Sequence, residues 1–473
     1  MAMKIINKST ATFLAFALMT LLSCKKQIEI APLSNVNSAN FYKTPSDILQ
    51  AVNAAYAGHR GVYTGRTSGL PPIFQLEDVR ADDYDNGNAG DDVMGNFQVD
   101  GSSEWYRWNW TDTYYAINLC NTVIDRAPNV EMDETLRNRY IAEARFLRAQ
   151  IYFLMVQDYG GIPLVLKETT SFDASLVNVP RSSVEDTYSQ IIDDLTFASA
   201  NLPPSYTGTD IGRATSWAAT GLLGKVYLQK GDLASAQTAL RAVVNSNLYS
   251  LMPTYKAAFS PTDHNNAESL FEIQHKADFA GSPYGNIFAT PNWGGAGPGY
   301  NYDLPSVTYF LNSFDPADQR KVGLTATDPL GNIYCIKYLD PAMTTGFNGN
   351  TDFPILRYAD ILLMLAESIG ESPEAYGYIN QVRNRAGLPD ISAATPGTFI
   401  DKVMNERRFE FAFECNRWHD ILRLGPTEAI QTMNNYFISV GSAKRIDNHD
   451  LLHPIPVSVI EVTKNIVEQN PGY

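Results

Sequence analysis

The sequence predicts an all-α protein, built as a tetratricopeptide-like helical repeat scaffold that carries a loop-rich, irregular lobe. Residues 214–246 form the clearest repeat, because two helical segments flank a glycine-containing turn within the roughly 34-residue period of a tetratricopeptide unit. Residues 355–386 resemble a second, more diverged unit. Helical periodicity is lost in residues 60–110 and 260–350, where glycine, proline, asparagine and aromatic residues dominate. Irregular segments of this length are usually functional, so we expect a site in the lobe.

The strongest helical pattern lies in residues 139–159 and ends on Gly160-Gly161, a typical helix stop. Its apolar stripe consists of Ala144, Leu147, Ile151, Leu154 and Met155. Further helices are expected at Asp47–His59 with Ser46 as the N-cap, Thr111–Arg126, Asp133–Gln157, Ser183–Ala200 and 406–422.

Residues 1–23 are expected to be a signal peptide. Lys4 and Lys8 form its basic region, and the apolar stretch Ala11–Leu22 is too short to cross a bilayer. The stretch ends in Leu-Leu-Ser followed by Cys24, the pattern of a bacterial lipobox, which predicts cleavage before Cys24 and lipidation of its thiol. Several acyl chains would anchor the protein stably to a membrane. The alternative is an ordinary signal peptide with an incidental cysteine.

Composition excludes several classes of function. With 44% hydrophobic and 18% charged residues the chain is globular, and a net charge of −15 argues against nucleic acid as a partner. Besides Cys24 the chain has Cys120, Cys335 and Cys415, and three cysteines cannot all pair. Cys120 and Cys415 lie on apolar helical patterns, so buried free thiols are expected. Without a C-x-x-C pair, a zinc-protease motif, a nucleophile elbow or a P-loop, we expect no metal, no cofactor and no catalytic residue.

Four separated segments carry a resemblance to a known family. They are AEARFLRA at 142–149 with QDYGGIPL at 157–164, ILRYADILLMLAES at 355–368 with INQVRNRAGL at 379–388, ERRFEFAFECNRWHDILRLG at 406–425, and LHPIP at 452–456 with QNPGY at 469–473. In this order they resemble the SusD/RagB family, cell-surface lipoproteins of Bacteroidetes that capture nutrients. The resemblance implies a signal peptide at 1–23, a lipidated tether at 24–46 and a single SusD-like domain at 47–473. Helical repeats would occupy about 47–260 and 351–473, and the loop-rich lobe about 60–110 and 261–350.

The glycine-rich stretch 279–302 is the leading candidate for ligand binding. Its aromatic residues are Tyr284, Trp293, Tyr300 and Tyr302. Sugar rings have apolar faces that stack on aromatic rings, and such rings are expected on exposed loops. The alternative is that these rings pack the loop onto the scaffold.

Residues 82–110 are the second candidate for ligand binding. Asp83 and Tyr84 precede an Asn/Gly-rich segment, and Trp105 and Tyr106 lie ahead of the helical pattern that begins near residue 111. The remaining tryptophans, Trp110, Trp217 and Trp418, are assigned to the core. In the predicted helix 406–422, charged residues three or four positions apart are expected to pair and to act structurally.

The family resemblance implies a binding protein without catalysis. It would capture an oligosaccharide or polysaccharide outside the cell and deliver it to a SusC-like TonB-dependent outer-membrane transporter. The alternatives are an oligopeptide-binding, RagB-like uptake component and a tetratricopeptide scaffold that binds only proteins; a glycosidase is the third possibility. Lys25 and Lys26 follow Cys24 where many surface-exported relatives have acidic residues, so the chain departs from the family pattern for outer-leaflet display but not from the pattern for anchoring.

Overall fold

The computed structural model describes residues 41–67, 69–85, 94–95, 97–171, 178–300, 304–307 and 309–473; the predicted signal peptide and Cys24 lie outside these residues. The helices are α2 (Pro45–Thr64), α3 (Pro72–Leu76), α4 (Glu104–Arg126), α5 (Glu134–Tyr159), α7 (Val184–Asn201), α8 (Ser216–Lys230), α9 (Leu233–Asn245), α10 (Tyr284–Ile287), α11 (Arg320–Leu324), α12 (Tyr358–Ile369), α13 (Pro373–Arg385), α14 (Phe399–Glu410), α15 (Arg417–Arg423), α16 (Pro426–Ser439) and α17 (Val457–Val462). The strands are β1 (Tyr84–Asp85), β2 (Ser269–Ile273), β3 (Leu304–Pro305), β4 (Thr325–Thr327), β5 (Ile333–Cys335) and β6 (Phe353–Arg357).

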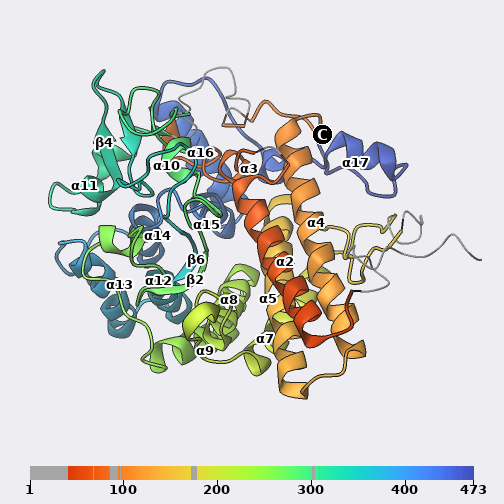
Figure 1. The fold of residues 1–473 in the computed structure, drawn as a ribbon. Helices are drawn as coiled ribbons and strands as arrows, with labels where there is room; N and C mark the ends of the chain where they lie inside the picture. Colours follow the sequence, from red (N-terminus) through yellow and green to blue (C-terminus); the bar gives the residue numbers. More distant parts are fainter. Residues whose placement is uncertain are drawn as a thin grey trace, which may run out of the picture.

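The long helices stack side by side in chain order, which confirms the predicted all-α repeat scaffold (Figure 1). Each of α4, α5, α7, α8 and α9 packs against the next, and α9 then packs against α12. The pair α8 and α9 turns at Gly231, whose φ of 83° is readily adopted by glycine. Gly224 lets the two helices approach closely, because a Cβ atom there would lie 2.6 Å from Leu240 Cγ.

Helix ends follow local capping chemistry. The N-cap of α2 is Thr44 and not the predicted Ser46, because Thr44 and Asp47 form a reciprocal capping box. Helix α4 starts at Glu104, seven residues before the predicted Thr111. Tyr106 and Trp110 are both buried and extend the inward face of that helix by two turns. The prediction that Trp105 and Tyr106 precede the helix is therefore wrong.

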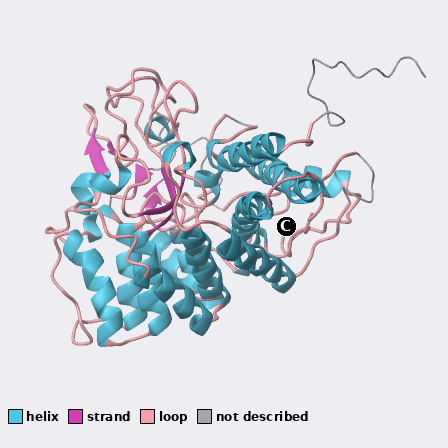
Figure 2. Cartoon of the chain, turned by 60° about the horizontal axis from the view of Figure 1, so that its bottom comes forward, coloured by secondary structure: helices cyan, strands magenta, loops and turns pink. Residues whose placement is uncertain are grey.

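The irregular lobe leaves and rejoins the scaffold through one antiparallel strand pair. Strand β2 pairs with β6, so residues 274–352 form an excursion with both ends side by side. Two further strand pairs, β1–β3 and β4–β5, lie inside or beside this excursion. Figure 2 shows the strands gathered among loops on one side of the stacked helices. No helix in the described part of the chain is long and apolar enough to span a membrane.

The predicted helix at 406–422 is interrupted. Helix α14 ends at Glu410 and α15 begins at Arg417, and Phe413 and Cys415 between them have φ values of 62° and 54°. Glu410 therefore pairs with distant arginines rather than along one helix: its carboxylate lies 2.5 Å from Arg357 on β6 and also contacts Arg385. These ion pairs fix the base of the lobe to the C-terminal helices.

Several core predictions are confirmed. Trp418 is 1% exposed, Trp110 is buried, and Trp217 is partly buried against the same core. The three cysteines within the described residues, Cys120, Cys335 and Cys415, are buried and free.

Candidate functional site

The two irregular regions predicted for the lobe, about 60–110 and 261–350, meet at the β1–β3 pair. Tyr84 pairs with Pro305 and Asp85 with Leu304, although more than 200 residues separate the strands. The backbone N–H of Ser306 adds a hydrogen bond of 2.8 Å to the carbonyl of Asp83. Nothing in the sequence indicates that the two regions are neighbours, whereas the structure pairs a strand of the first region with a strand of the second.

A buried asparagine shapes the glycine-rich loop at 291–300. The Asn286 side-chain amide donates to the carbonyls of Ala296 and Pro298, both at 2.9 Å, and its oxygen accepts from the Phe347 N–H at 2.8 Å. Its own carbonyl accepts from the Tyr300 N–H at 3.0 Å. Asn286 is fully buried, so these bonds are shielded from water. These hydrogen bonds hold the loop in one conformation.

Trp293 is a partly exposed ring on this loop. Its indole N–H donates to the Gly297 carbonyl at 3.1 Å, and its backbone N–H donates to Thr290 at 3.2 Å. The ring rests against Gly295, since a Cβ atom there would lie 2.3 Å from the indole. The ring orientation is thus set before any ligand arrives, and part of the ring remains accessible.

Tyr300 and Phe347 form a second aromatic element beside the loop. Their ring centroids are 5.2 Å apart in an edge-to-face arrangement, and both rings are partly exposed. Phe347 is missed by the sequence reasoning, because it lies 47 residues beyond Tyr300 in the chain. The fourth predicted ring, Tyr302, lies outside the described residues.

Tyr284 does not face a ligand surface, which corrects the prediction for this residue. It is fully buried, and its ring lies 5.2 Å from both Phe353 and His275 and 5.5 Å from Phe74. Burial also raises the pKa of its hydroxyl well above the usual value. Tyr284 therefore belongs to the core that lies beneath the loop.

Asp83 and Tyr84 are likewise corrected to internal contacts. Asp83 is buried in an ion pair with Arg408, and burial raises the pKa of its carboxyl to about 6 although Arg408 opposes this. The Tyr84 hydroxyl accepts a hydrogen bond of 2.6 Å from the Phe413 N–H, and the two rings pack 4.8 Å apart. Asp83 attaches the start of β1 to α14, and Tyr84 attaches β1 to the segment between α14 and α15.

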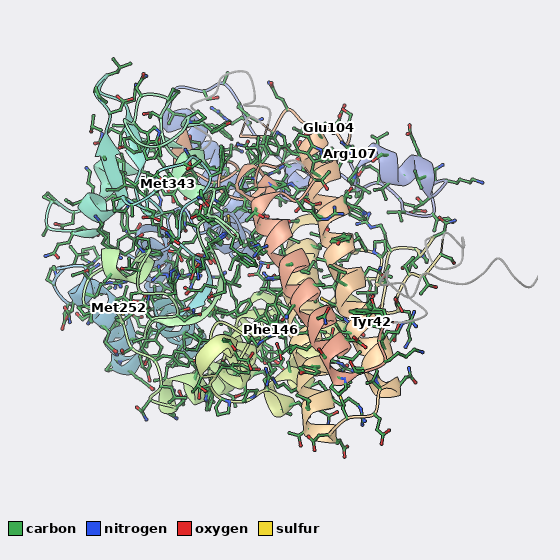
Figure 3. The ribbon with its side chains drawn as sticks, viewed as in Figure 1. Tyr42, Glu104, Arg107, Phe146, Met252 and Met343 are labelled. Carbon is green, nitrogen blue, oxygen red and sulfur yellow. The ribbon has the colours of Figure 1, made fainter. Side chains whose placement is uncertain are left out.

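The start of α4 divides its aromatic residues between core and surface. Tyr106 is fully buried, which corrects its predicted ligand role, and its ring packs 5.2 Å from His453. Trp105 remains partly exposed and meets Trp108 edge-to-face at 5.1 Å. Figure 3 shows the neighbouring Glu104 and Arg107 at the upper end of α4. Trp105 and Trp108 thus stay available as surface rings.

Hollows also exist on the helical scaffold. One of about 610 Å³ lies between the start of α5 and the segment after α7 and is lined by Arg139 and Tyr206. Another of about 500 Å³ lies between α7, α8 and α9 and is lined by Tyr227. These hollows are the physical basis for the alternative of a scaffold that binds proteins.

Two family models match complementary parts of the chain. A model of the SusD family matches residues 318–473, and a model described as starch-binding associating with outer membrane matches residues 74–228. The chain belongs to the SusD-like family.

SusD-like relatives match nearly the whole chain. SusD-like protein P2 from Formosa agariphila is 28% identical over 99% of this chain and 100% of its own length. A solved laminarin-binding SusD-like protein is 24% identical with a TM-score of 0.77, covering 91% of this chain and 100% of its own. Surface glycan-binding protein A from Bacteroides thetaiotaomicron, solved with laminarihexaose, is 21% identical with a TM-score of 0.77, covering 90% and 100%. At these identities the structural likeness establishes the fold.

Proposed function

We propose that this SusD-like protein binds an oligosaccharide on its loop-rich lobe and makes or breaks no bond in it. The observation that carries the proposal is Trp293, a partly exposed ring whose orientation is fixed by Gly297 and Gly295. A ring held in place loses little side-chain entropy on binding, so stacking of a sugar face is more favourable than on a free side chain. Tyr300, Trp105 and Trp108 are the other described candidate contacts. Two proteins of the same fold are named for laminarin or were solved with laminarihexaose.

We further propose that the protein is anchored to the outer membrane through Cys24, faces the cell exterior, and passes its ligand to a SusC-like TonB-dependent transporter. The lipobox pattern supports the anchor, and the description of the matching family model names the outer membrane. The acidic net charge of −15 argues against nucleic acid as a partner.

The scaffold hollow beside Tyr227 favours a second candidate, the binding of a peptide or protein segment. Short apolar and hydroxyl side chains from α7, α8 and α9 line that hollow. It offers no preset aromatic platform, so we rank it below the lobe.

The test is calorimetric titration of the purified chain with a panel of oligosaccharides, laminarihexaose included, and a panel of oligopeptides. Trp293→Ala removes the ring, Trp293→Phe keeps a ring but loses the bond to Gly297, and Tyr115→Ala removes an exposed ring from α4 as the matched control. We expect affinity for one glycan to fall at least about tenfold in Trp293→Ala, to fall less in Trp293→Phe, and to stay unchanged in Tyr115→Ala.

Binding of peptides alone, with sensitivity to Tyr227→Ala, would instead favour the scaffold hollow. Chromatography of the glycan after incubation tests catalysis separately, and shortened products would overturn the proposal of binding without chemistry.

A further inference from the structure

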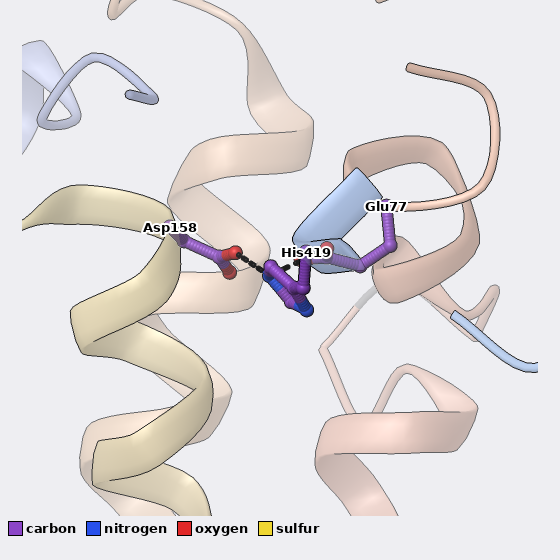
Figure 4. Close-up of side chains that lie close together, drawn as sticks. All are labelled: Glu77, Asp158 and His419. Atoms are coloured by element: carbon purple, nitrogen blue, oxygen red, sulfur yellow. Dashed lines mark hydrogen bonds and ion pairs between the residues drawn. The ribbon is translucent and has the colours of Figure 1, made fainter. Parts of the chain in front are cut away.

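A cluster of ionisable side chains lies buried away from the lobe surface, where three distant segments converge. Glu77 follows α3, Asp158 lies near the end of α5, and His419 lies on α15 (Figure 4). His419 Nε2 is 2.9 Å from Glu77 Oε2 and 3.0 Å from Asp158 Oδ1. One donor atom from each residue lies within 4.8 Å of the other two. The imidazole is held between the two carboxylates.

Hydrogen bonding within the cluster is incomplete. A single Nε2–H can be well aligned with one acceptor, and it meets Asp158 Oδ1. Both carboxylate oxygens of Glu77 and the second oxygen of Asp158 lack a hydrogen-bond partner among the described residues. Buried acceptors are normally satisfied, so these three carboxylate oxygens offer lone pairs to a further bound species.

His453 is an independent observation that indicates what this species is. Its side chain is fully buried, and neither ring nitrogen has a hydrogen-bond partner among the described residues. Nε2 of His453 lies 3.9 Å from Asp158 Oδ1, the same oxygen that contacts His419. The backbone N–H of His453 donates to the Asp158 carbonyl at 2.7 Å, which fixes the histidine beside the cluster. A neutral imidazole without a hydrogen-bond partner, next to carboxylates, has a nitrogen lone pair that can bind a metal ion.

We propose that Glu77, Asp158, His419 and His453 bind a divalent transition-metal ion. Imidazole nitrogen combined with carboxylate oxygen suits ions such as zinc, iron and nickel better than calcium or magnesium. His419 Nε2 lies 2.9 and 3.0 Å from the two carboxylate oxygens, close to the separation of neighbouring donors around a six-coordinate ion with bonds of about 2.1 Å. His453 Nε2, 3.9 Å from Asp158 Oδ1, is the more distant donor.

Charge supports the same ligand. Two buried carboxylates balance the two charges of the ion, with both histidines neutral. Arg80, a nearby cation, donates instead to the Tyr106 hydroxyl and the Asp450 carbonyl.

A cavity beside His419 would give an ion access to the site, and a bound ion would link distant segments of the chain. His419 also lines a cavity of about 50 Å³, whose polar residues include Gln150, Gln157 and Lys225. An ion bound here would join α3, α5, α15 and the segment at 453, which belong to parts of the chain far apart in sequence. We therefore expect the ion to stabilise the fold without contacting the glycan, so its test is independent of the proposed function.

The experiment uses the purified chain after removal of metal with a chelator. Zn²⁺ is titrated in competition with a chromophoric chelator, and Co²⁺ is added separately as a spectroscopic probe. Glu77→Gln and His453→Gln remove donors and retain a polar side chain. His449→Asn is the matched control, because Asp447, His449 and Asp450 form the other described group of potential donors, at the surface.

We expect one equivalent of Zn²⁺ to bind the wild type and His449→Asn, with a rise in Tm of several degrees. Affinity should fall at least about tenfold in Glu77→Gln and His453→Gln, and the rise in Tm should disappear. Co²⁺ should give the same visible absorption with the wild type and His449→Asn.

Failure of Zn²⁺ to bind at micromolar concentration, or wild-type affinity in both donor variants, would overturn the proposal in favour of buried water or a shared proton. Loss of binding in His449→Asn alone would assign the metal to the surface. If the donor variants do not fold, the comparison of the wild type with His449→Asn still tests the proposal. A buried site predicts the same Co²⁺ absorption for both proteins, and a difference between them refutes it.

Discussion

Asn286 offers the sharpest test of how the lobe prepares its surface. Asn286→Ala removes three side-chain hydrogen bonds, to Ala296, Pro298 and Phe347, at 2.9, 2.9 and 2.8 Å. Each hydrogen bond contributes about 1 kcal/mol net, so the free energy that favours this loop conformation over others should fall by roughly 3 kcal/mol. That corresponds to about a hundredfold change in the population of the binding conformation, at about 1.4 kcal/mol per tenfold.

Calorimetry with the cognate oligosaccharide should therefore show affinity up to about a hundredfold weaker in Asn286→Ala. Hydrogen exchange should become faster at residues 291–300, whereas the stacked helices should keep their protection. Asn286→Asp keeps the acceptor for the Phe347 N–H but sets a buried carboxylate oxygen against the Ala296 and Pro298 carbonyls, so it should lose at least as much affinity. Asn312→Ala, an exposed asparagine of the same lobe, is the control and should bind as the wild type. Unchanged affinity in Asn286→Ala, together with normal exchange, would refute the view that this residue shapes the site.

Three further predictions concern stability and location. Trp418→Ala should lower the free energy of unfolding by about 3–5 kcal/mol in urea denaturation, because it removes a fully packed ring; an unchanged midpoint would contradict the core assignment. Burial beside Asp352 raises the pKa of Glu272 to about 8, so its contribution to stability is full below about pH 4.3 and is lost as pH rises to about 8. Thermal unfolding should accordingly show wild-type stability falling from pH 5 to pH 8 relative to Glu272→Gln, and parallel curves would disprove this. Cys24→Ala should release the protein from the outer-membrane fraction, and retention there would refute the lipid anchor.

Local sequence patterns predict the scaffold well. The α8–α9 unit follows from apolar spacing and a glycine at the turn, and α5 ends at Gly160, whose φ is 70°. Periodicity failed at 406–422, because the break at Phe413 and Cys415 is imposed by contacts with residues far away in sequence. The Tyr84 hydroxyl holds the Phe413 N–H, and Asp78 holds the Cys415 N–H at 3.0 Å. No local pattern encodes such a break.

The candidate site was predicted only in part, for a similar reason. An aromatic residue in a glycine-rich loop has the same local signature whether it is exposed, like Trp293, or fully buried, like Tyr284. The hydrogen bonds of Asn286 to the loop at 291–300 and the cluster around His419 depend on residues that the fold brings together. A count of spacings in the sequence cannot detect either of them.

The most direct measurement is a crystal structure of the chain with a bound oligosaccharide, chosen from the glycan that binds in calorimetry. We predict that a sugar ring stacks on Trp293, with centroids about 4.5–5.5 Å apart, and that Tyr300 or Phe347 lines the same surface. The loop at 291–300 should keep its bonds to Asn286 in the complex. A glycan located in the hollow beside Tyr227, with Trp293 free of contacts, would contradict the proposal that the lobe is the binding site.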